Sequence, residues 1–297
     1  EIRRRVLMAF ERAELADTSK EKERQLTFVI IGAGPTGVEM AGAIAELANI
    51  SLRGDFRRIS PDNARIILVE GGPRVLGAFP ERLSGKAKAS LEKLGVDVRT
   101  GALVEDVTGE HVVVAGEKIP AATGIWAAGV KGDHLDTWLG VDTDRVGRVA
   151  VEPDLTVPGT PNVSVIGDAA KVPWKDGFDV PGIAPAAKQE GKYTGRRLAA
   201  LVAGKSAPSP FRYRHLGNLA TIGRNSAIIS MGWFKLSGFI AWCIWGAVHI
   251  YFLIGGKRPL FVAMSWVSNY LFRSKGARLI TGMEGLRAIH LHVPKKG

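Results

Sequence analysis

The stretch FVIIGAGPTGVE, residues 28–39, decides the fold. Its first four residues are apolar and predict a strand that is covered on both faces, since such strands form continuous hydrophobic runs. Gly32, Gly34 and Gly37 follow at GxGxxG spacing, and apolar residues then continue at helical spacing to residue 47. In a dinucleotide-binding turn, these glycines allow a tight turn, close approach of the backbone to a pyrophosphate, and close packing of helix on strand. The strand before the glycines and the helix after them favour this interpretation over an ordinary loop.

The start of the helix would hold phosphate groups through its free amides and its partial positive charge. The residues expected to bind the cofactor at this turn are Gly32, Gly34, Pro35, Thr36 and Gly37.

A second buried strand is predicted at residues 65–72, RIILVEGG, with Glu70 at its tip. A carboxylate at this place accepts hydrogen bonds from the adenosine ribose hydroxyls. It lies 33 residues after Gly37, whereas about 20 is usual, and an inserted loop at 53–64 accounts for the excess. Glu70 favours NAD over NADP, although the nearby Arg74 weakens that preference. The alternative is a solvated charge at the end of a strand.

The remaining pattern is typical of an α/β protein. We expect helices at residues 1–16, from the glycine turn to about residue 52, and at 81–94. We also expect a short strand at 96–99, a β-meander at 102–107, 111–115 and 117–119, and strands at 124–130 and 163–166. Residues 17–25 read as a polar connector and 133–152 as irregular, while 182–204 become helical only after a break at Pro185.

Composition limits the function classes. The 297 residues suggest about two domains, and the net charge of +11 is concentrated at the end of the chain. Residues 255–297 hold eight basic residues against one glutamate, interleaved with apolar runs, which favours lipid over nucleic acid as the partner. Cys243 is the only cysteine, so the sequence excludes an internal disulfide or a redox-active cysteine pair within this chain. No metal site is expected.

The apolar tail is a candidate for membrane contact. Leu236 to Gly256 form 21 residues without a formal charge, long enough for a spanning helix. A buried core helix and a monotopic anchor are the other two interpretations. Aromatic residues and the basic residues that flank the segment after 256 favour a monotopic anchor over residues 236–272.

The stretch TVPGTPNVSVIGDA, residues 156–169, resembles the segment that closes the FAD site in two-dinucleotide-binding-domain flavoproteins. Within that group the chain is most similar to the type II NADH dehydrogenases, the non-pumping NADH:quinone oxidoreductases. The phrases that carry the resemblance are AFERAE (9–14), GAGPTGVEMAGAIAEL (32–47), LVEGGPRVL (68–76), WAAGV (126–130), IGDAA (166–170), PAAKQEGKYTG (185–195) and AWCIWGAVHIYFLIG (241–255).

The resemblance implies a role for each matching residue. The turn at 32–37 would bind the NADH pyrophosphate and Glu70 its ribose. Glu39 would lie near the nicotinamide and flavin, with Gly129 leaving room for the nicotinamide. The residues implied to contact FAD or the quinone site are Gly167, Asp168, Ala187, Lys188 and Gln189.

Two of these implied roles carry qualifications from the sequence itself. Many relatives place a second glutamine where this chain has Pro185, which weakens a quinone site built from a glutamine pair. Lys188 either assists proton delivery beside Gln189 or is a solvated helix lysine.

The resemblance implies an α/β fold with tandem Rossmann-like, FAD- and NAD(P)-binding domains and a C-terminal helical membrane-anchoring region. The expected domains are the end of the first FAD segment (1–24), the NADH domain (25–122), the returning FAD segment (123–232) and the anchor (233–297). The family also has a GxGxxG turn for FAD before these segments. This chain has no second such turn, so we expect an N-terminally truncated sequence.

The expected function is FAD-dependent transfer of hydride from NADH to flavin and of two electrons to ubiquinone or menaquinone. The resemblance also implies a homodimer at the cytoplasmic face of a bacterial inner membrane, with no nucleic-acid partner. Two alternatives are a soluble flavin-dependent NADH:ferredoxin or disulfide reductase, and a non-catalytic NAD-binding membrane adaptor.

Overall fold

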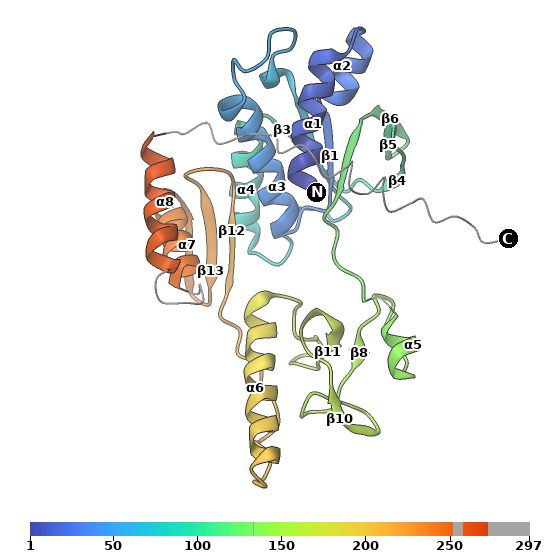
Figure 1. The fold of residues 1–297 in the computed structure, drawn as a ribbon, viewed down its shortest axis with the longest axis vertical. Coiled ribbons are helices and arrows are strands. Elements are labelled where there is room, and N and C mark those ends of the chain that lie inside the picture. Colours follow the sequence, from blue (N-terminus) through green and yellow to red (C-terminus); the bar gives the residue numbers. More distant parts are fainter. Residues whose placement is uncertain (133, 252–257, 273–297) are drawn as a thin grey trace, which may run out of the picture. The chain divides into compact units, whose positions relative to one another are not determined.

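The computed structural model describes residues 1–132, 134–251 and 258–272, and in the last stretch the side chains of 261–268 (Figure 1). The chain divides into two compact units. The first unit contains Glu1–Ala128 and the described residues from Asn218 onward, and the second contains Gly129–Gly217. The opening helix and the strands after 217 therefore group with the NADH-domain segment, whereas the sequence analysis assigned them to separate domains.

A four-stranded parallel sheet forms the centre of the first unit, in the order β3-β2-β1-β7 (Figure 1). The strands are β1 Thr27–Ile31, β2 Arg65–Glu70, β3 Val96–Thr100 and β7 Thr123–Trp126. Every residue of β1 is buried, which confirms the strand predicted before the glycine turn. β7 is shorter than the predicted strand 124–130: it ends at Trp126, and Gly129 further along has a φ of +101°.

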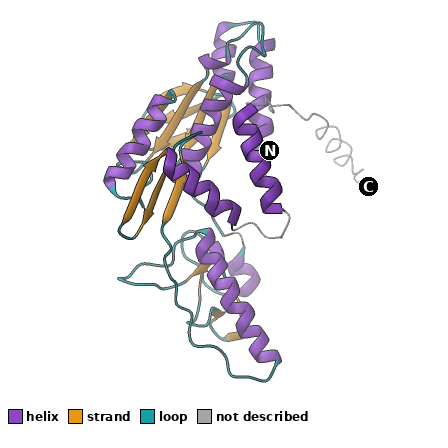
Figure 2. Cartoon of the chain, turned by 90° about the vertical axis from the view of Figure 1, so that its left-hand side faces the viewer, coloured by secondary structure: helices purple, strands orange, loops and turns teal. Residues whose placement is uncertain are grey.

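The two faces of this sheet pack against different layers. Phe28 and Leu68 point into a core shared with the helices, whereas Val29 and Ile67 point into a core shared with the meander. The helices are α1 Ile2–Leu15, α3 Pro35–Glu46 and α4 Glu81–Lys93, with a π-helical turn Leu47–Ser51 after α3 and a short 3-10 turn Pro61–Asn63. The meander, predicted correctly, is β4 Val104–Val107, β5 His111–Val114 and β6 Glu117–Pro120. Figure 2 shows the helices in purple packed beside the strands in orange.

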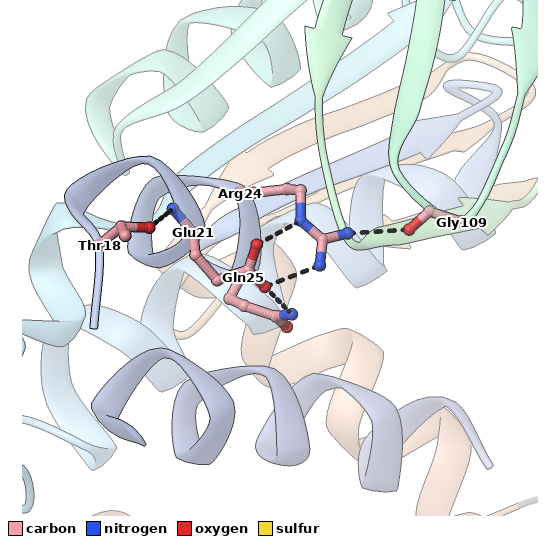
Figure 3. Close-up of polar contacts among 5 residues, drawn as sticks. All are labelled: Thr18, Glu21, Arg24, Gln25 and Gly109. Atoms are coloured by element: carbon pink, nitrogen blue, oxygen red, sulfur yellow. Dashed lines mark hydrogen bonds and ion pairs between the residues drawn. The ribbon is translucent and has the colours of Figure 1, made fainter. Parts of the chain in front are cut away.

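The stretch predicted as a polar connector instead forms helix α2, Ser19–Gln25. Thr18 caps this helix, since its hydroxyl accepts a hydrogen bond from the backbone N–H of Glu21 at 3.2 Å. Arg24 donates to the Glu21 carboxylate at 2.7 and 2.8 Å and to the carbonyl of Gly109 in the meander at 3.0 Å (Figure 3). The cap and the polar contacts stabilise a short helix that has no apolar stripe, so hydrophobic periodicity could not reveal it.

After residue 217 the chain returns to the first unit as an antiparallel sheet, in the order β12-β13-β14. Its strands are β12 Asn218–Thr221, β13 Ala227–Met231 and β14 Phe234–Gly238, followed by α7 Phe239–Tyr251 and α8 Arg258–Phe272. α3 packs against β12, and α7 contacts all three strands.

The uncharged stretch 236–256, for which the sequence left a spanning helix, a core helix and a monotopic anchor open, is divided between two elements. Leu236–Gly238 complete β14, α7 begins at Phe239, and residues 252–256 lie outside the described part of the chain. Ala241 on α7 is fully buried against Ala227 and Ile229. Within the described residues, no helix combines the length and the apolar content needed to cross a bilayer.

The second unit has short strands and one long helix around its own core. Its elements are α5 Leu135–Leu139, β8 Val149–Ala150, β9 Thr156–Val157, β10 Thr160–Ser164, the 3-10 turn Gly167–Ala169, β11 Ala170–Lys171 and α6 Ala184–Val202. β8 pairs with β11 in parallel, and β9 pairs with β10 antiparallel.

Three predictions in the second unit were inaccurate. The region expected to be irregular contains α5 and β8, and the strand predicted to reach residue 166 ends at Ser164. Pro185 does not break α6, because it lies in the first turn, where no backbone N–H is required.

Candidate functional site

The glycine turn joins β1 to α3, and two of its glycines are required by close backbone contacts. Gly32 donates its N–H to the carbonyl of Val69 at 2.8 Å and has φ +97°. A side chain on Gly32 would begin 2.6 Å from the Cα of Ala128, and one on Gly37 would overlap the carbonyl oxygen of Gly32. The predicted tight turn and close helix–strand packing are therefore both present.

Gly34 differs from its neighbours, because a Cβ atom there would meet nothing within 4 Å. It is the N-cap residue of α3 and has no side-chain cap, while Pro35 and Thr36 beside it are exposed. The first N–H groups of a helix have no intrahelical acceptor, and the space where a side chain on Gly34 would lie is open. This arrangement fits an anionic phosphate group.

Glu70 lies at the tip of β2, beside the glycine turn. Its Oε2 accepts the backbone N–H of Ala33 at 2.7 Å, and its Oε1 accepts that of Gly72 at 2.8 Å. The carboxylate thus fixes the turn itself, and the remaining lone pairs of its oxygens are left for ribose hydroxyls. Arg74 is exposed and donates to the carbonyl of Gly77 at 3.1 Å.

Two glutamates of α3, seven residues apart on one face, bind the β12–β13 hairpin. Glu39 accepts the backbone N–H of Thr221 at 3.2 Å, and Glu46 accepts that of Arg224. Burial raises the pKa of Glu46, and the Arg224 hydrogen bond only partly opposes it. Gly42 lies between the two glutamates and would place a Cβ atom 2.7 Å from the N of Gly223. The helix of the glycine turn is therefore attached to the C-terminal sheet.

Glu39 was identified from the sequence, whereas Glu46 was not. The only sequence signal for Glu46 was its seven-residue spacing from Glu39, which repeats a position on a helix face.

In the second unit, the segment predicted to close a flavin site forms a 3-10 turn at the end of the apolar stretch 163–166. Gly167 has φ +69°, and Asp168 follows it with an exposed side chain. Ala187 on α6 packs behind this turn, with its Cβ 3.5 Å from where a Cβ on Gly167 would lie. The turn thus presents one carboxylate beside the first residues of a helix.

The side-chain amide of Gln189 is hydrogen-bonded to backbone groups. Its side-chain amide donates to the carbonyl of Arg214 at 2.9 Å and to that of Pro185 at 3.2 Å, and its oxygen accepts the N–H of Arg214 at 3.0 Å. Lys188 beside it is exposed. Glu190, the one acidic residue of this helix, is buried. It was not identified from the sequence, because the exposure of one helix residue depends on what packs against it.

The predicted site residues form two groups, one in each unit. The turn residues 32–37, Glu39 and Glu70 lie together in the first unit, and residues 167, 168 and 187–189 lie together in the second. Gly129, the first residue of the second unit, directly follows Ala128, which packs on Gly32. Among the described residues, no three His, Cys, Asp or Glu side chains cluster as metal ligands.

Comparison with known proteins finds two family matches along the chain. Residues 5–191 match the pyridine nucleotide-disulphide oxidoreductase family, and residues 215–274 match the NDH2 C-terminal domain. The type II NADH:quinone oxidoreductases Ndh and NdhA of Mycobacterium tuberculosis are 41% and 40% identical to this chain over 98% and 95% of its length. The chain spans 64% and 62% of the length of these two relatives.

Among solved structures, NDH2 from Plasmodium falciparum in complex with NADH superimposes with a TM-score of 0.81 at 20% identity. The match covers 94% of this chain and 72% of that one, and it concerns the fold. Together, the glycine turn, the two matched domains and these relatives lead to one conclusion. The chain belongs to the pyridine nucleotide-disulphide oxidoreductase family and, within it, to the type II NADH dehydrogenases.

Proposed function

We propose that the complete protein is an FAD-dependent NADH:quinone oxidoreductase that does not pump protons. The observation that carries this proposal is the open N-terminus of α3 at Gly34, in a chain whose curated relatives are named type II NADH:quinone oxidoreductases. When bound, FAD would accept hydride from NADH and pass two electrons to a quinone. Ubiquinone and menaquinone are both compatible with the residues described.

In this proposal the first unit binds NADH. The backbone N–H groups of Gly34 and Thr36, on either side of Pro35, would hold the pyrophosphate, with Gly32 and Gly37 keeping the backbone close enough to reach it. Glu70 would accept the adenosine ribose hydroxyls, which favours NADH over NADPH. The backbone N–H of Thr221 binds Oε1 of Glu39, and the other carboxylate oxygen would act on proton movement near the nicotinamide.

The second unit would supply part of the FAD site and the approach of the quinone. Asp168 is exposed at the end of an apolar strand segment, which fits an acceptor for the hydroxyls of the ribityl chain. Gly129 would leave space for the nicotinamide, and Gly167, Ala187 and Lys188 would line the flavin. Gln189 would act beside the quinone, and its clasp on the backbone of Arg214 would orient it.

We further propose that residues 236–272 attach the protein to the cytoplasmic face of a bacterial inner membrane, as a homodimer. Exposed apolar side chains on α7 and α8 support this placement, including Ile240, Tyr251, Phe261 and Met264. Trp245 and Trp266 stack with ring centroids 5.9 Å apart, so the two helices can act as one surface. Rings of this kind favour the membrane interface.

Two other functions are tested against the proposal. A soluble NADH:ferredoxin or disulfide reductase would use the same nucleotide turn, but Cys243 is the only cysteine in the sequence. A non-catalytic NAD-binding adaptor would bind NADH without retaining flavin.

The test uses the complete protein at the length of its curated relatives. We expect a purified protein with bound FAD, NADH oxidation that depends on a quinone, and sedimentation with anionic lipid vesicles. Phe261→Glu should reduce sedimentation, while Trp138→Glu, at an exposed tryptophan on α5, should not. Electron transfer to ferredoxin or a disulfide but not to quinone would favour the soluble reductase, and NADH binding without flavin would favour the adaptor.

A further inference from the structure

Glu190 is an acidic side chain buried inside the second unit. It lies on α6 and only 2% of its surface is exposed. Its Oε2 accepts the backbone N–H of Gly167 at 2.5 Å. Glutamate is rarely buried to this extent unless it is paired, because burial costs free energy that hydrogen bonds must offset. The bond to Gly167 is therefore the feature to explain.

The bond from Gly167 to Glu190 holds a turn in which the backbone is left-handed. Gly167 has φ +69°, and Asp168 is the next residue. On its other side, Asp168 lies against Gly182, where a Cβ atom would come within 3.1 Å of its Oδ1. The exposed carboxylate of Asp168 is thus held between a glycine-lined loop and a turn that Glu190 anchors to α6.

The groups that face Glu190 come from two other segments. Asp168 acts on it from the turn, and together with burial it raises the pKa of Glu190. From the segment after α6, Tyr213 is buried, and burial and Glu190 raise its pKa. The hydroxyl of Tyr213 lies 3.0 Å from Nδ1 of His215. Glu190 therefore interacts with the turn that carries Asp168 and with the segment after α6.

We propose that Glu190 is a positioning residue of the FAD site, which orients Asp168 toward the ribityl chain by accepting the N–H of Gly167. This inference rests on the proposed function, since it assigns FAD as the ligand of Asp168. Glu190 acts through the turn and does not itself contact the cofactor.

The test compares variants that separate the hydrogen bond from packing and charge. Glu190→Gln keeps an acceptor for the Gly167 N–H, whereas Glu190→Leu keeps the volume but leaves that N–H without a partner. Tyr193→Phe is the matched control, since it removes a buried hydroxyl on the same helix that has no hydrogen-bond partner among the described residues. The readouts are the dissociation constant of FAD for the deflavinated complete protein, and the Tm without FAD.

We expect Glu190→Leu to bind FAD at least about tenfold more weakly, and Glu190→Gln to stay within about threefold of the parent. The FAD affinity of Tyr193→Phe should equal that of the parent, because this hydroxyl does not contact the Gly167 turn. The KM for NADH should be the same in all variants, because NADH binding does not involve that turn. Equal FAD affinity in Glu190→Leu and the parent would overturn the inference. So would equal losses in the Leu and Gln variants, or losses of FAD affinity that only follow losses of Tm.

If Glu190→Leu does not fold, Glu190→Asp replaces it, because the shorter side chain keeps the charge but withdraws the acceptor from Gly167. Weaker FAD binding by Glu190→Asp supports the inference, and parental binding overturns it. If the parent protein itself binds no FAD, the proposed function fails, which is a separate outcome.

Discussion

At the residue scale, Gly32, Gly34 and Gly37 differ in what surrounds a side chain at each position. Backbone atoms crowd Gly32 and Gly37, and Gly32 also has a positive φ, so both serve the fold of the turn. Gly34 has ordinary backbone angles, φ −67° and ψ −178°, and open space in front of it. The fold therefore does not require glycine at this position, which fits the proposed contact with a ligand. Substitution can separate this binding role from the structural role of Gly32 and Gly37.

Gly34→Ala should leave the fold intact and weaken NADH binding, because the added methyl group occupies the space proposed for the pyrophosphate. We expect a rise in the KM for NADH of about tenfold or more, with a Tm close to the parent. Gly85→Ala is the control, since Gly85 lies within α4 with nothing near its Cβ position and far in sequence from the turn. Steady-state kinetics and thermal unfolding measure both quantities, and an unchanged KM in Gly34→Ala would contradict this role.

Glu70→Gln should narrow the preference for NADH over NADPH, since a neutral amide repels the 2′-phosphate less than a carboxylate does. It should also weaken the turn, because a glutamine has one acceptor oxygen for the N–H groups of Ala33 and Gly72. The ratio of kcat/KM for the two cofactors is the measurement. Glu81→Gln, at an exposed residue of α4, should change neither property. An unchanged ratio in Glu70→Gln would remove Glu70 from selecting the cofactor.

The tight turn and the close helix–strand packing at Gly32 and Gly37 were predictable from the sequence, because GxGxxG spacing between a strand and a helix is a local pattern. The contact of Gly34 with a pyrophosphate stays a prediction. The double hydrogen bond of Glu70 was not predictable, since it requires the position of Gly72 after the strand ends. Glu190 and Glu46 were missed for a similar reason. Their burial is produced by segments that are distant in sequence or by turns whose conformation no spacing rule reveals.

At the scale of elements, α3 connects the nucleotide turn to the C-terminal sheet. Its contact face carries Glu39, Gly42 and Glu46, which meet the hairpin between β12 and β13. The glutamates at the two ends of this face accept backbone N–H groups of the hairpin. The glycine between them has no side chain, so the hairpin backbone can approach α3 closely.

Gly42→Ala should destabilise the protein by about 1–3 kcal/mol, because its methyl group meets the backbone of Gly223. Gly85→Ala is again the control, and there the same change should stabilise the helix by about 0.5–1 kcal/mol. Urea unfolding of both variants measures the opposite signs. A stabilising effect of Gly42→Ala would show that α3 and the hairpin are not in close contact.

The pKa of Glu46 makes the same interface sensitive to pH. Burial raises this pKa in the folded state above the ordinary value of 4.5, so folding favours the protonated form. The contribution of Glu46 to stability is therefore full below about pH 4.5 and is lost as the pH rises through the folded pKa.

Glu46→Gln removes this loss and keeps an acceptor for the N–H of Arg224. We expect its Tm to exceed that of the parent by about 2 °C at pH 8 and to match it near pH 4. Thermal unfolding across this range gives the difference, with Glu81→Gln as the exposed control. A Tm advantage that grows toward low pH would have the wrong sign for this mechanism.

Elements with a strong hydrophobic period were predicted well, including β1, β2, α4 and the meander. Two short helices, α2 and α5, were not predicted, because α2 is formed by a cap and ion pairs, and α5 has no buried residue. The boundary between the strand β14 and the helix α7 within the uncharged tail was not predicted, since apolar content alone does not distinguish the two elements.

At the scale of the whole molecule, the residues proposed to bind cofactors form two groups, one in each compact unit. It spans 64% of the length of Ndh from Mycobacterium tuberculosis, so its proposed activity belongs to the complete protein. The family and the α/β fold were predictable because the glycine turn and the stretch 156–169 are local sequence patterns. The return of residues after 217 to the first unit was not, since no local pattern records which unit a later strand joins.

Anaerobic stopped-flow absorption of the complete protein follows the proposed electron transfer from NADH through flavin to quinone. We expect NADH to bleach the bound flavin near 450 nm and a later addition of quinone to restore the flavin spectrum. A protein that binds no flavin would contradict the account, as would a flavin that NADH reduces but quinone does not reoxidise.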